Sequence, residues 1–323
     1  MNRRAFFLAA SVSALSLCGA VAQAQDFPTR PITLVVPYTA GGSADITART
    51  LAEYLKVELG QPVIVENKPG AGTMLAAEHV AKAAPDGYTI LMSGSSVVVA
   101  PVLNESKRYD PIKSFVAIGG IATIPHLLVV PTSTPAKSVS ELIAYLKANP
   151  TAASYASVGM GATNHLEGEL FRTLSGTQAT HIPYKGSAPA LVDLLAGRTQ
   201  FMFDAYSSSK PFIDEGKLRV LGISSGKRSA SMPQFPTVAE AGLPGFDTTP
   251  WLGITAPAGT PKPVAERLNL ALVKALDAPA LRARFKELGM DIMEFNQSQF
   301  ERFVEGNSKV WIDIIKGANI RIQ

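Results

Sequence analysis

Short apolar runs alternate with amphipathic segments along most of this chain. The runs TLVVPY, PVIVEN, TILMSG, LLVVP, SYASVG, HIPY, QFMFD and LRVLGIS have the length and composition of buried strands. Segments such as ADITARTLAEYL and SVSELIAYLKAN lie between them and repeat apolar residues every three or four positions, which is typical of helices with one buried face. The alternation predicts parallel or mixed sheets covered by helices, and hence the α/β class.

The C-terminal part has a different pattern. Two long helical patterns cover residues 264–288 and 298–318, with almost no strand between them. They follow a segment rich in proline and glycine, 235–263, which holds one strand-like run, WLGITAP. Because segments of this composition commonly connect domains, we place a return crossing between two domains here.

Two glycine-rich junctions follow predicted strands and precede predicted helices. The first is PYTAGGSAD, Pro37 to Asp45, and the second is VGMGATN, Val158 to Asn164. Glycine leaves backbone N–H groups uncovered at the positive end of a helix, which is a ready site for an anion. Ligands of open α/β sheets lie at the carboxyl ends of the strands, so we expect the two loops to face each other across a cleft.

The first 24 residues have the features of a secretory signal peptide. Arg3 and Arg4 precede an apolar run over residues 6–17, and the triplet AQA ending at Ala24 fits a cleavage site. The run is shorter than the roughly 20 residues that span a bilayer. The paired arginines suit the twin-arginine export route as well as an ordinary signal, and both routes stay open. We expect an exported, periplasmic protein cleaved near Ala24.

Charge and cysteine content narrow the class of protein. The 30 lysines and arginines exceed the 26 acidic residues by four, and removal of Arg3 and Arg4 with the leader reduces this excess to two. A nearly balanced mature surface argues against nucleic-acid binding, which requires a basic stripe. The sole cysteine, Cys18, also lies in the leader, so disulfides, thiolate metal sites and cysteine nucleophiles are excluded from the mature chain. Leu17 stands where a lipoprotein signal has a small residue, which argues against a lipid anchor.

Two catalytic motifs are present in part and are rejected. Gly222 to Gly226 reads G-x-S-x-G, but no helical pattern follows it, and all four histidines precede Ser224, whereas an α/β hydrolase needs its histidine after the serine. Gly159-Met160-Gly161 begins like a dinucleotide fingerprint, but Asn164 occupies the third glycine position. We therefore predict neither a catalytic residue nor a cofactor.

The histidines do not form a metal-binding pattern. None has a second histidine four residues on, and His165 and Glu167 point to different faces of a helix. No metal site is predicted. His165 suits a capping or packing role, and contact with a ligand is the alternative.

Segments along nearly the whole mature length resemble one known family. They are PYTAGGSAD, ENKPGAG, DGYTILM, YASVGMGATNHLEGELF, HIPYKGSAPALVDLLAG, MFD, GKLRVLGISS, RSASMPQFPTVAEAGLPGF and WLGITAPAGTP. In this order they resemble the extracytoplasmic solute receptors of tripartite tricarboxylate transporters, often called the Bug family. The resemblance implies a type II-like periplasmic-binding-protein fold of two α/β domains, with the ligand cleft between them and two hinge crossings. We assign residues 25–125 and 250–323 to domain 1 and residues 126–249 to domain 2.

The resemblance also implies a ligand class and a partner. Receptors of this family bind tricarboxylates, dicarboxylates, acidic amino acids or aromatic acids, and they work with membrane permease subunits. They hold one ligand carboxylate largely through backbone N–H groups of the two glycine-rich loops. The matching residues here are Tyr38, Thr39, Ala40, Gly41, Gly42 and Ser43 in the first loop, and Ser157, Gly159, Gly161, Ala162 and Thr163 in the second.

Further residues are expected to end strands on the cleft side. They are Ser93 and Ser95 on an SGSS loop, Lys185 and Gly186 in YKGS, and Asp204 after FMF. Lys185 equally suits a solvated turn. Asp45 either accepts a bond from a ligand or stabilises the helix dipole, and the second role is favoured. Ala162 stands where many relatives carry serine or threonine, so backbone capture survives there while a hydroxyl contact is lost.

The function predicted from these features is capture of a small organic acid by domain closure and its delivery to a tripartite tricarboxylate-type membrane transporter. A periplasmic ligand sensor without a transport role is an alternative that needs the same closed form. An exported enzyme acting on a carboxylate is less favoured, because no constellation of acid, base and nucleophile is visible in the sequence.

Overall fold

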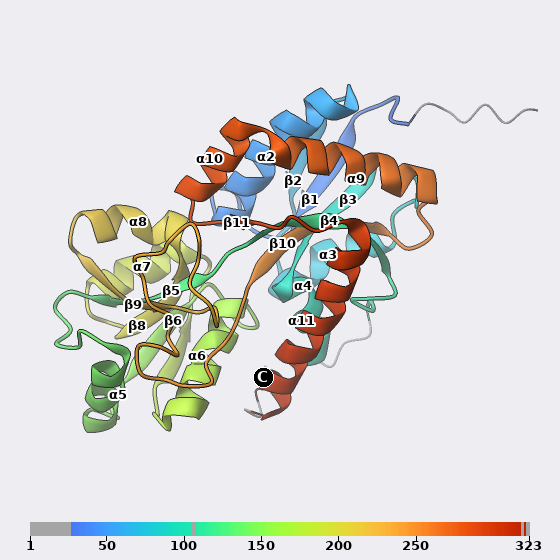
Figure 1. Ribbon diagram of the computed structural model, residues 1–323. Helices are drawn as coiled ribbons and strands as arrows, with labels where there is room; N and C mark the ends of the chain where they lie inside the picture. The colour runs from blue at the N-terminus through green and yellow to red at the C-terminus, as the bar shows by residue number, and fades with distance from the viewer. Residues whose placement is uncertain (1–26, 105–107, 318–319, 321–323) are drawn as a thin grey trace, which may run out of the picture.

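The computed structural model describes residues 27–104, 108–317 and 320. The predicted signal peptide, residues 1–24, lies outside the described residues. Two sheets, each surrounded by helices, form the two lobes of the molecule in Figure 1. Within the described chain, no helix combines the length and the apolar character needed to cross a bilayer.

The first sheet has six strands in the order β11-β4-β10-β3-β1-β2. These are β1 (Ile32–Val36), β2 (Val63–Asn67), β3 (Thr89–Gly94), β4 (Phe115–Thr123), β10 (Trp251–Pro257) and β11 (Asp291–Ile292). β1 pairs in parallel with β2 and β3, whereas β10 runs antiparallel between β3 and β4. Its helices are α2 (Ser43–Leu59), α3 (Met74–Ala81), α4 (Ser95–Leu103), α9 (Lys262–Asp277), α10 (Pro279–Glu287) and α11 (Gln297–Gly317), with a 3-10 turn η1 (Ala71–Thr73).

The second sheet has five strands in the order β7-β6-β8-β5-β9. These are β5 (His126–Pro131), β6 (Ser154–Ser157), β7 (Thr180–Pro183), β8 (Phe201–Ala205) and β9 (Leu218–Ile223). β6 is parallel to β7 and β8, and β5 is antiparallel to β8 and β9. Its helices are α5 (Val139–Ala148), α6 (Thr163–Ser175), α7 (Ser187–Leu195) and α8 (Tyr206–Asp214).

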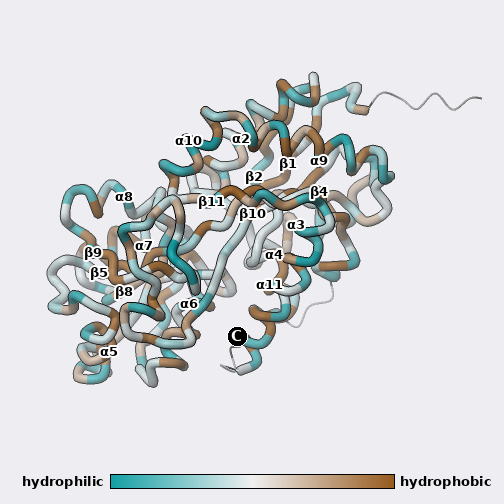
Figure 2. Tube along the Cα trace, in the orientation of Figure 1, coloured by the Kyte–Doolittle hydropathy of each residue, from teal (hydrophilic) through white to brown (hydrophobic). Residues whose placement is uncertain are grey.

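Both faces of each sheet are packed against helices or connecting segments. In β1, Leu34 faces the core shared with α2 and α9, and the next residue, Val35, faces the core shared with α3. In β5, Leu128 packs among aromatic residues of the second sheet, while Leu127 packs on the opposite face. Figure 2 shows hydrophobic residues gathered along the strands and hydrophilic ones on outer helices such as α10. Strands buried on both faces are apolar throughout, which explains their continuous runs in the sequence.

The chain passes between the sheets twice, and the two crossings lie side by side. The first joins β4 to β5 through Ile124 and Pro125, and the second comprises residues 224–250 between β9 and β10. The Ile124 N–H donates to the Pro250 carbonyl at 2.8 Å. The two crossings are thus hydrogen-bonded to each other where the chain passes between the sheets.

Two further contacts join the parts built on the two sheets. Trp311 of α11 packs with Leu103 of α4 and with Leu166 of α6, so α11 reaches the second sheet's helices. In the second crossing, Ser229 Oγ donates to Asp291 Oδ2 at 2.7 Å, and the Ser231 N–H donates to Asp291 Oδ1 at 2.8 Å. β11 of the first sheet is therefore bonded to a segment that follows β9 of the second.

Some elements differ from the sequence expectation. The run FVAIGGIAT forms β4, a strand that the pattern did not predict because Gly119 and Gly120 interrupt its apolar residues. A Cβ at Gly120 would lie 2.6 Å from Met293 Sδ, so the missing side chain makes room for a packed neighbour. The helical pattern over 264–288 is divided at Ala278 and Pro279 into α9 and α10.

The expectation that Ser93 and Ser95 lie on a loop is wrong. Ser93 lies within β3, and Ser95 is the first residue of α4. The run SSVVVAPVL is rich in β-branched residues, which favour strands, and it contains Pro101. Tertiary burial overrides these preferences, because eight of the nine residues of α4 are buried.

Candidate ligand-binding site

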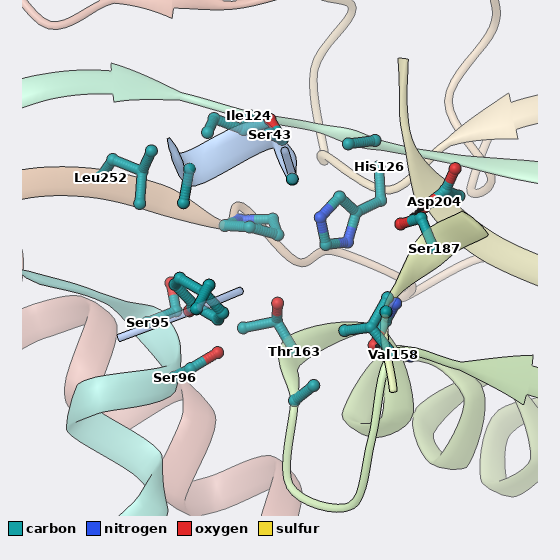
Figure 3. A pocket seen from close by; sticks show the side chains of 18 of the residues that line it. Ser43, Ser95, Ser96, Ile124, His126, Val158, Thr163, Ser187, Asp204 and Leu252 are labelled. Carbon is teal, nitrogen blue, oxygen red and sulfur yellow. Dashed lines mark hydrogen bonds between the residues drawn. The ribbon is translucent and has the colours of Figure 1, made fainter. Parts of the chain in front are cut away.

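Five helices begin at one pocket between the two sheets. Ser43, Ser95, Thr163 and Ser187, the first residues of α2, α4, α6 and α7, line this pocket, and Ala205 lines it just before α8. Figure 3 shows Ser43 and Ser95 on one side and Thr163 and Ser187 on the other. The cavity has a volume of about 150 Å³, which is the size of a cavity that accommodates benzene.

The residues before these helices do not cap them. They are Gly42, Gly94, Ala162, Gly186 and Ala205, and none of them makes a side-chain capping bond. By contrast, Ser138 Oγ accepts a bond from the Glu141 N–H at the start of α5. The first N–H groups of a helix have no partner within the helix. The five helix starts therefore direct open donors and positive dipole ends at the pocket, which suits an anion.

Two hydroxyl groups at these helix starts also lack partners. Ser43 Oγ and Ser95 Oγ are buried, and neither makes a hydrogen bond within the described chain. Leaving a buried polar group unsatisfied costs about 1–3 kcal/mol. Both residues line the pocket, so a bound ligand with oxygen atoms would satisfy them.

No lysine or arginine is among the described residues that line the pocket, so the groups there that favour an anion are mainly those of the backbone. Among the described lining residues, the ionisable side chains are those of Tyr38, His126 and Asp204. The walls also contain apolar side chains, including Ile124, Trp251 and Leu252. A ligand with an anionic group and an apolar portion is thus complementary to this surface.

Asp45 shapes the first loop from behind the pocket. It is 3% exposed, and its carboxylate accepts bonds from the Gly41 N–H at 2.8 Å and from Asn67 Nδ2 at 2.9 Å. Burial alone would raise its pKa, but these bonds and the Arg49 guanidinium hold the pKa of Asp45 below its ordinary value. These contacts give Asp45 a structural role in holding the first loop, whereas its predicted effect on the helix dipole stays a prediction. The carboxylate also occupies the Gly41 N–H, one of the donors expected for the ligand.

Two stacked histidines support the second loop. The rings of His165 and His181 lie 4.0 Å apart, with the Gly161 N–H donating to His165 Nδ1 and Ser157 Oγ bonded to His181 Nε2 at 2.6 Å. Burial lowers the pKa of His165 to about 4 and, together with the His165 charge, lowers the pKa of His181 to about 3. Both rings are neutral at pH 7, and His165 Nδ1 accepts the hydrogen bond from the Gly161 N–H of the loop.

His126 and Asp204 both lie at the pocket, and each is held by polar partners. His126 Nδ1 lies 2.6 Å from Glu167 Oε2, and Thr248 Oγ1 donates to the other oxygen of Glu167 at 2.9 Å. The Asp204 carboxylate accepts bonds from three hydroxyl groups, those of Ser187, Ser208 and Ser209 at 2.6–2.7 Å. The negative charge of Asp204 is thus satisfied within the protein.

The structure brings some of the predicted residues together at the pocket and places others outside it. Those that line it are Tyr38, Thr39, Gly42, Ser43, Ser95, Ala162, Thr163, Gly186 and Asp204. Those outside the lining are Ala40, Gly41, Asp45, Ser93, Ser157, Gly159, Gly161, His165 and Lys185. Several of the second group lie behind the lining. Ser93 is buried in the first sheet, and hydrogen bonds of Ser157 and His165 support the second loop. Lys185 is exposed, as its alternative role requires.

Sequence reasoning missed Ser96, His126, Ser187 and Trp251, all of which line the pocket. Ser187 follows Gly186 in a strand-glycine-helix junction of the kind that identified the first two loops, so the same signal was available. His126 and Trp251 begin strands directly after the two crossings. Their pairing at one pocket depends on tertiary structure.

A family model described as the tripartite tricarboxylate transporter family receptor matches residues 47–320. Among solved structures, the R. palustris protein Rpa4515 with adipate is 36% identical, covers 91% of this chain and 99% of that one, and superposes with a TM-score of 0.86. The periplasmic binding protein BugD is 37% identical over 92% of this chain and 100% of that one, with a TM-score of 0.84.

A third structure, MatC from Rhodopseudomonas palustris with bound malate, is 33% identical over 90% of this chain and 100% of that one, with a TM-score of 0.83. These matches extend over both sheets and confirm the resemblance that the sequence motifs indicated. The chain therefore belongs to the tripartite tricarboxylate transporter receptor family, the Bug family, and has the two-domain fold of the periplasmic binding proteins.

Proposed function

We propose that this protein captures a small organic acid between its two domains in the periplasm and delivers it to a tripartite tricarboxylate-type membrane transporter. The observation that carries the proposal is the convergence of five uncapped helix starts on one pocket. Such ends favour an anion without any lysine or arginine side chain. Adipate and malate, the ligands of two similar receptors, are both dicarboxylates.

Hydrogen bonds from the protein are enough to account for micromolar affinity. Charge-assisted hydrogen bonds contribute about 1.5–3 kcal/mol each. Four or five of them, less the cost of desolvation and closure, reach the roughly 8 kcal/mol of a micromolar complex. The partnerless hydroxyls of Ser43 and Ser95 add two candidate donors at the same place.

Capture is proposed to be coupled to domain closure about the two crossings. The donors come from helices of both domains, α2 and α4 from one and α6 to α8 from the other. A helix end in open water is screened and binds weakly, so the site is complete only when the domains meet. Residues 25–125 with 250–323, and residues 126–249, are the proposed moving units.

Export by the predicted signal peptide is part of the same proposal. Cleavage near Ala24, by the general or the twin-arginine route, would place the mature protein in the periplasm. Mass determination of the protein purified from the periplasmic fraction tests this directly. A mature chain that still carries residues 1–24 would contradict the cleavage.

The test of the ligand class uses protein that has been unfolded, dialysed and refolded so that it carries no ligand. Its thermal midpoint is measured against mono-, di- and tricarboxylates, acidic amino acids, aromatic acids and the corresponding amides. A ligand at one hundred times its dissociation constant adds about 2.7 kcal/mol, which raises the midpoint by a few degrees. Stabilisation by an acid but not by its amide supports anion capture. Stabilisation by amides alone would overturn the proposal.

The transport role is tested separately, because a sensor would bind the same ligand. Uptake of the radiolabelled acid that stabilises the protein is measured in cells with and without this receptor. Loss of uptake in the deletion strain, restored by the intact chain, supports delivery. Unchanged uptake with a changed transcriptional response would favour a sensor.

A further inference from the structure

His126 is the one basic side chain among the described residues that line the pocket. It begins β5 directly after the first crossing, and Figure 3 shows its imidazole directed into the pocket. Only 13% of its side chain is exposed. A largely buried ring in this position can form hydrogen bonds with a ligand, with the surrounding protein, or with both.

Glu167 fixes the orientation of this ring. Its carboxylate is 0% exposed and lies 2.6 Å from His126 Nδ1, while Thr248 Oγ1 holds its second oxygen at 2.9 Å. Because a carboxylate accepts hydrogen bonds, Nδ1 carries the proton that joins the pair. Nε2 then lies on the side of the ring away from Glu167, where it meets the pocket.

The protonation state of His126 decides what Nε2 offers to a ligand. In the neutral ring Nε2 would be an acceptor, and in the imidazolium it is a donor. Burial alone would lower the pKa of His126, but the facing carboxylates of Glu167 on α6 and Asp204 on β8 raise it above its ordinary value. The raised pKa extends the pH range in which the ring is protonated and Nε2–H donates.

The neighbouring carboxylate does not compete for this donor. Both oxygens of Asp204 accept hydroxyl protons from α7 and α8, and the residue is 1% exposed. Glu167 balances the charge of the imidazolium. His126 therefore supplies a directed hydrogen bond more than a net positive charge.

We propose that His126 is a specificity-determining residue, which donates from Nε2 to a second oxygen acceptor of the ligand while the helix starts hold the first carboxylate. Glu167 is the positioning residue that orients it. The inference rests on the proposed function and deepens it. The ligand class is a short acid with a second acceptor group, such as a dicarboxylate, in preference to a monocarboxylate with an apolar tail.

The ion pair also joins β5 to α6, so the test must separate ligand selection from a structural role. The matched ligands are adipate with hexanoate and malate with 3-hydroxybutyrate, each pair differing by one carboxylate. The proteins are the wild type, His126→Asn, Glu167→Gln and the double variant His126→Asn/Glu167→Gln. The double variant keeps a neutral hydrogen-bonding pair and avoids an unpaired buried carboxylate. His79→Asn, an exposed histidine on α3, is the control.

Binding is measured by calorimetry on refolded, ligand-free protein, and melting curves establish that each variant is folded. The wild type and His79→Asn are expected to prefer the diacid of at least one pair. His126→Asn and the double variant should lose about ten- to hundredfold in affinity for that diacid and less than about twofold for its monoacid. Diacid affinity of the wild type should fall as pH rises through the raised pKa of His126, and this dependence should be absent from the double variant.

Three results would overturn the inference. Equal losses for diacid and monoacid in the double variant would assign the pair a structural role, with the proposed receptor function intact. Wild-type preference for the monoacids would exclude a second acceptor. Binding of no acid in the wider carboxylate panel would overturn the receptor function, and this inference with it.

Discussion

At the scale of single residues, the site depends on the absence of capping side chains. Gly42, Ala162 and Ala205 stand where serine, threonine, aspartate or asparagine would ordinarily satisfy the first N–H groups of a helix. In the proposed function, the ligand takes the place of the cap. A capping residue would stabilise the ligand-free protein. Without one, the same N–H groups form their hydrogen bonds, and stabilise the protein, only when a ligand is bound.

Gly42→Asp tests this exchange. Gly42 has φ −80°, and a Cβ there would lie 3.6 Å from the Thr39 carbonyl, so a side chain fits. The new carboxylate is expected to bind the N–H groups of α2 and to repel an anion. Acid affinity should fall by at least about tenfold, the effect of one charged hydrogen bond, while the melting temperature stays within a few degrees. Gly42→Ala, which adds no acceptor, is the control, and an equal loss in it would refute the capping explanation.

The two neutral histidines behind the second loop give a pH dependence of stability. Unfolded histidine has a pKa near 6.5, whereas burial lowers the pKa of His165 to about 4 and that of His181 to about 3. The unfolded chain therefore binds more protons in this range, and the free energy of unfolding should fall as pH decreases from about 6.5 to about 4.

Urea unfolding at a series of pH values measures this dependence. Carboxylates elsewhere also titrate below pH 5, so the wild type is compared with His165→Asn/His181→Gln, whose side-chain amides replace the ring nitrogens as hydrogen-bonding groups that do not titrate. The variant should show a shallower decrease between pH 6.5 and 5. Identical slopes would mean that the histidines are not the source.

At the scale of elements, α11 contacts helices of both domains through Trp311. This side chain is 0% exposed and packs with Leu103 and Leu166, yet its Nε1–H is buried without a partner in the described chain. Trp311 therefore stabilises the fold through apolar contacts, and the cost of burying an unsatisfied N–H reduces that stabilisation.

Two substitutions separate these contributions. Trp311→Ala should lower the free energy of unfolding by about 3–5 kcal/mol, because it leaves a large cavity. Trp311→Phe keeps most of the contact and removes the unsatisfied N–H, so its effect should be clearly smaller. Chemical denaturation measures both. An equally large loss in Trp311→Phe would indicate that the indole N–H has a partner in solution.

The strands and helices could be predicted to different degrees from the sequence. The runs that form β1, β5 and β8 are apolar because both faces of each strand are buried, and that pattern is local. The pattern did not predict β4 and α4, because both depend on contacts distant in sequence. In β4, Gly119 and Gly120 leave room for side chains from other elements, and in α4 burial keeps a valine-rich run helical. Such elements depend on contacts that a local pattern does not contain.

At the scale of the whole molecule, the contact of Asp291 with Ser229 and Ser231 ties the first domain to the second crossing. Asp291→Ala removes both bonds, each contributing about 0.5–1.5 kcal/mol. We expect the open form to become more populated and ligand affinity to fall several-fold, because the proposed capture uses the closed form. The control is Asp247→Ala, which removes a bond to the Gly226 N–H within the same crossing segment.

Small-angle scattering and calorimetry measure the two effects together. The ligand-free Asp291→Ala protein should have a larger radius of gyration than the wild type, and the difference should vanish when saturating acid is added. An unchanged radius with reduced affinity would show that Asp291 acts on the pocket and not on the domain equilibrium.

The site itself could be predicted in part. Glycine-rich junctions identified Gly42, Ser43, Ala162 and Thr163, because a strand-to-helix turn with open N–H groups is visible in a sequence. His126 was not found, since its significance lies in Glu167, a residue 41 positions later. The side chains that line the pocket come from both domains, and their meeting depends on the fold.

The proposed capture of an anion by backbone N–H groups has a consequence for how such a receptor evolves. Every residue except proline carries this donor, so most substitutions at Thr39 or Ala162 alter the wall without removing the group that binds the carboxylate. Side chains such as His126 can change in one step. In this proposal, most substitutions preserve the affinity for a carboxylate, whereas substitutions of side chains change the specificity among acids. One scaffold can therefore change its ligand without losing its fold or its ability to bind the earlier ligand.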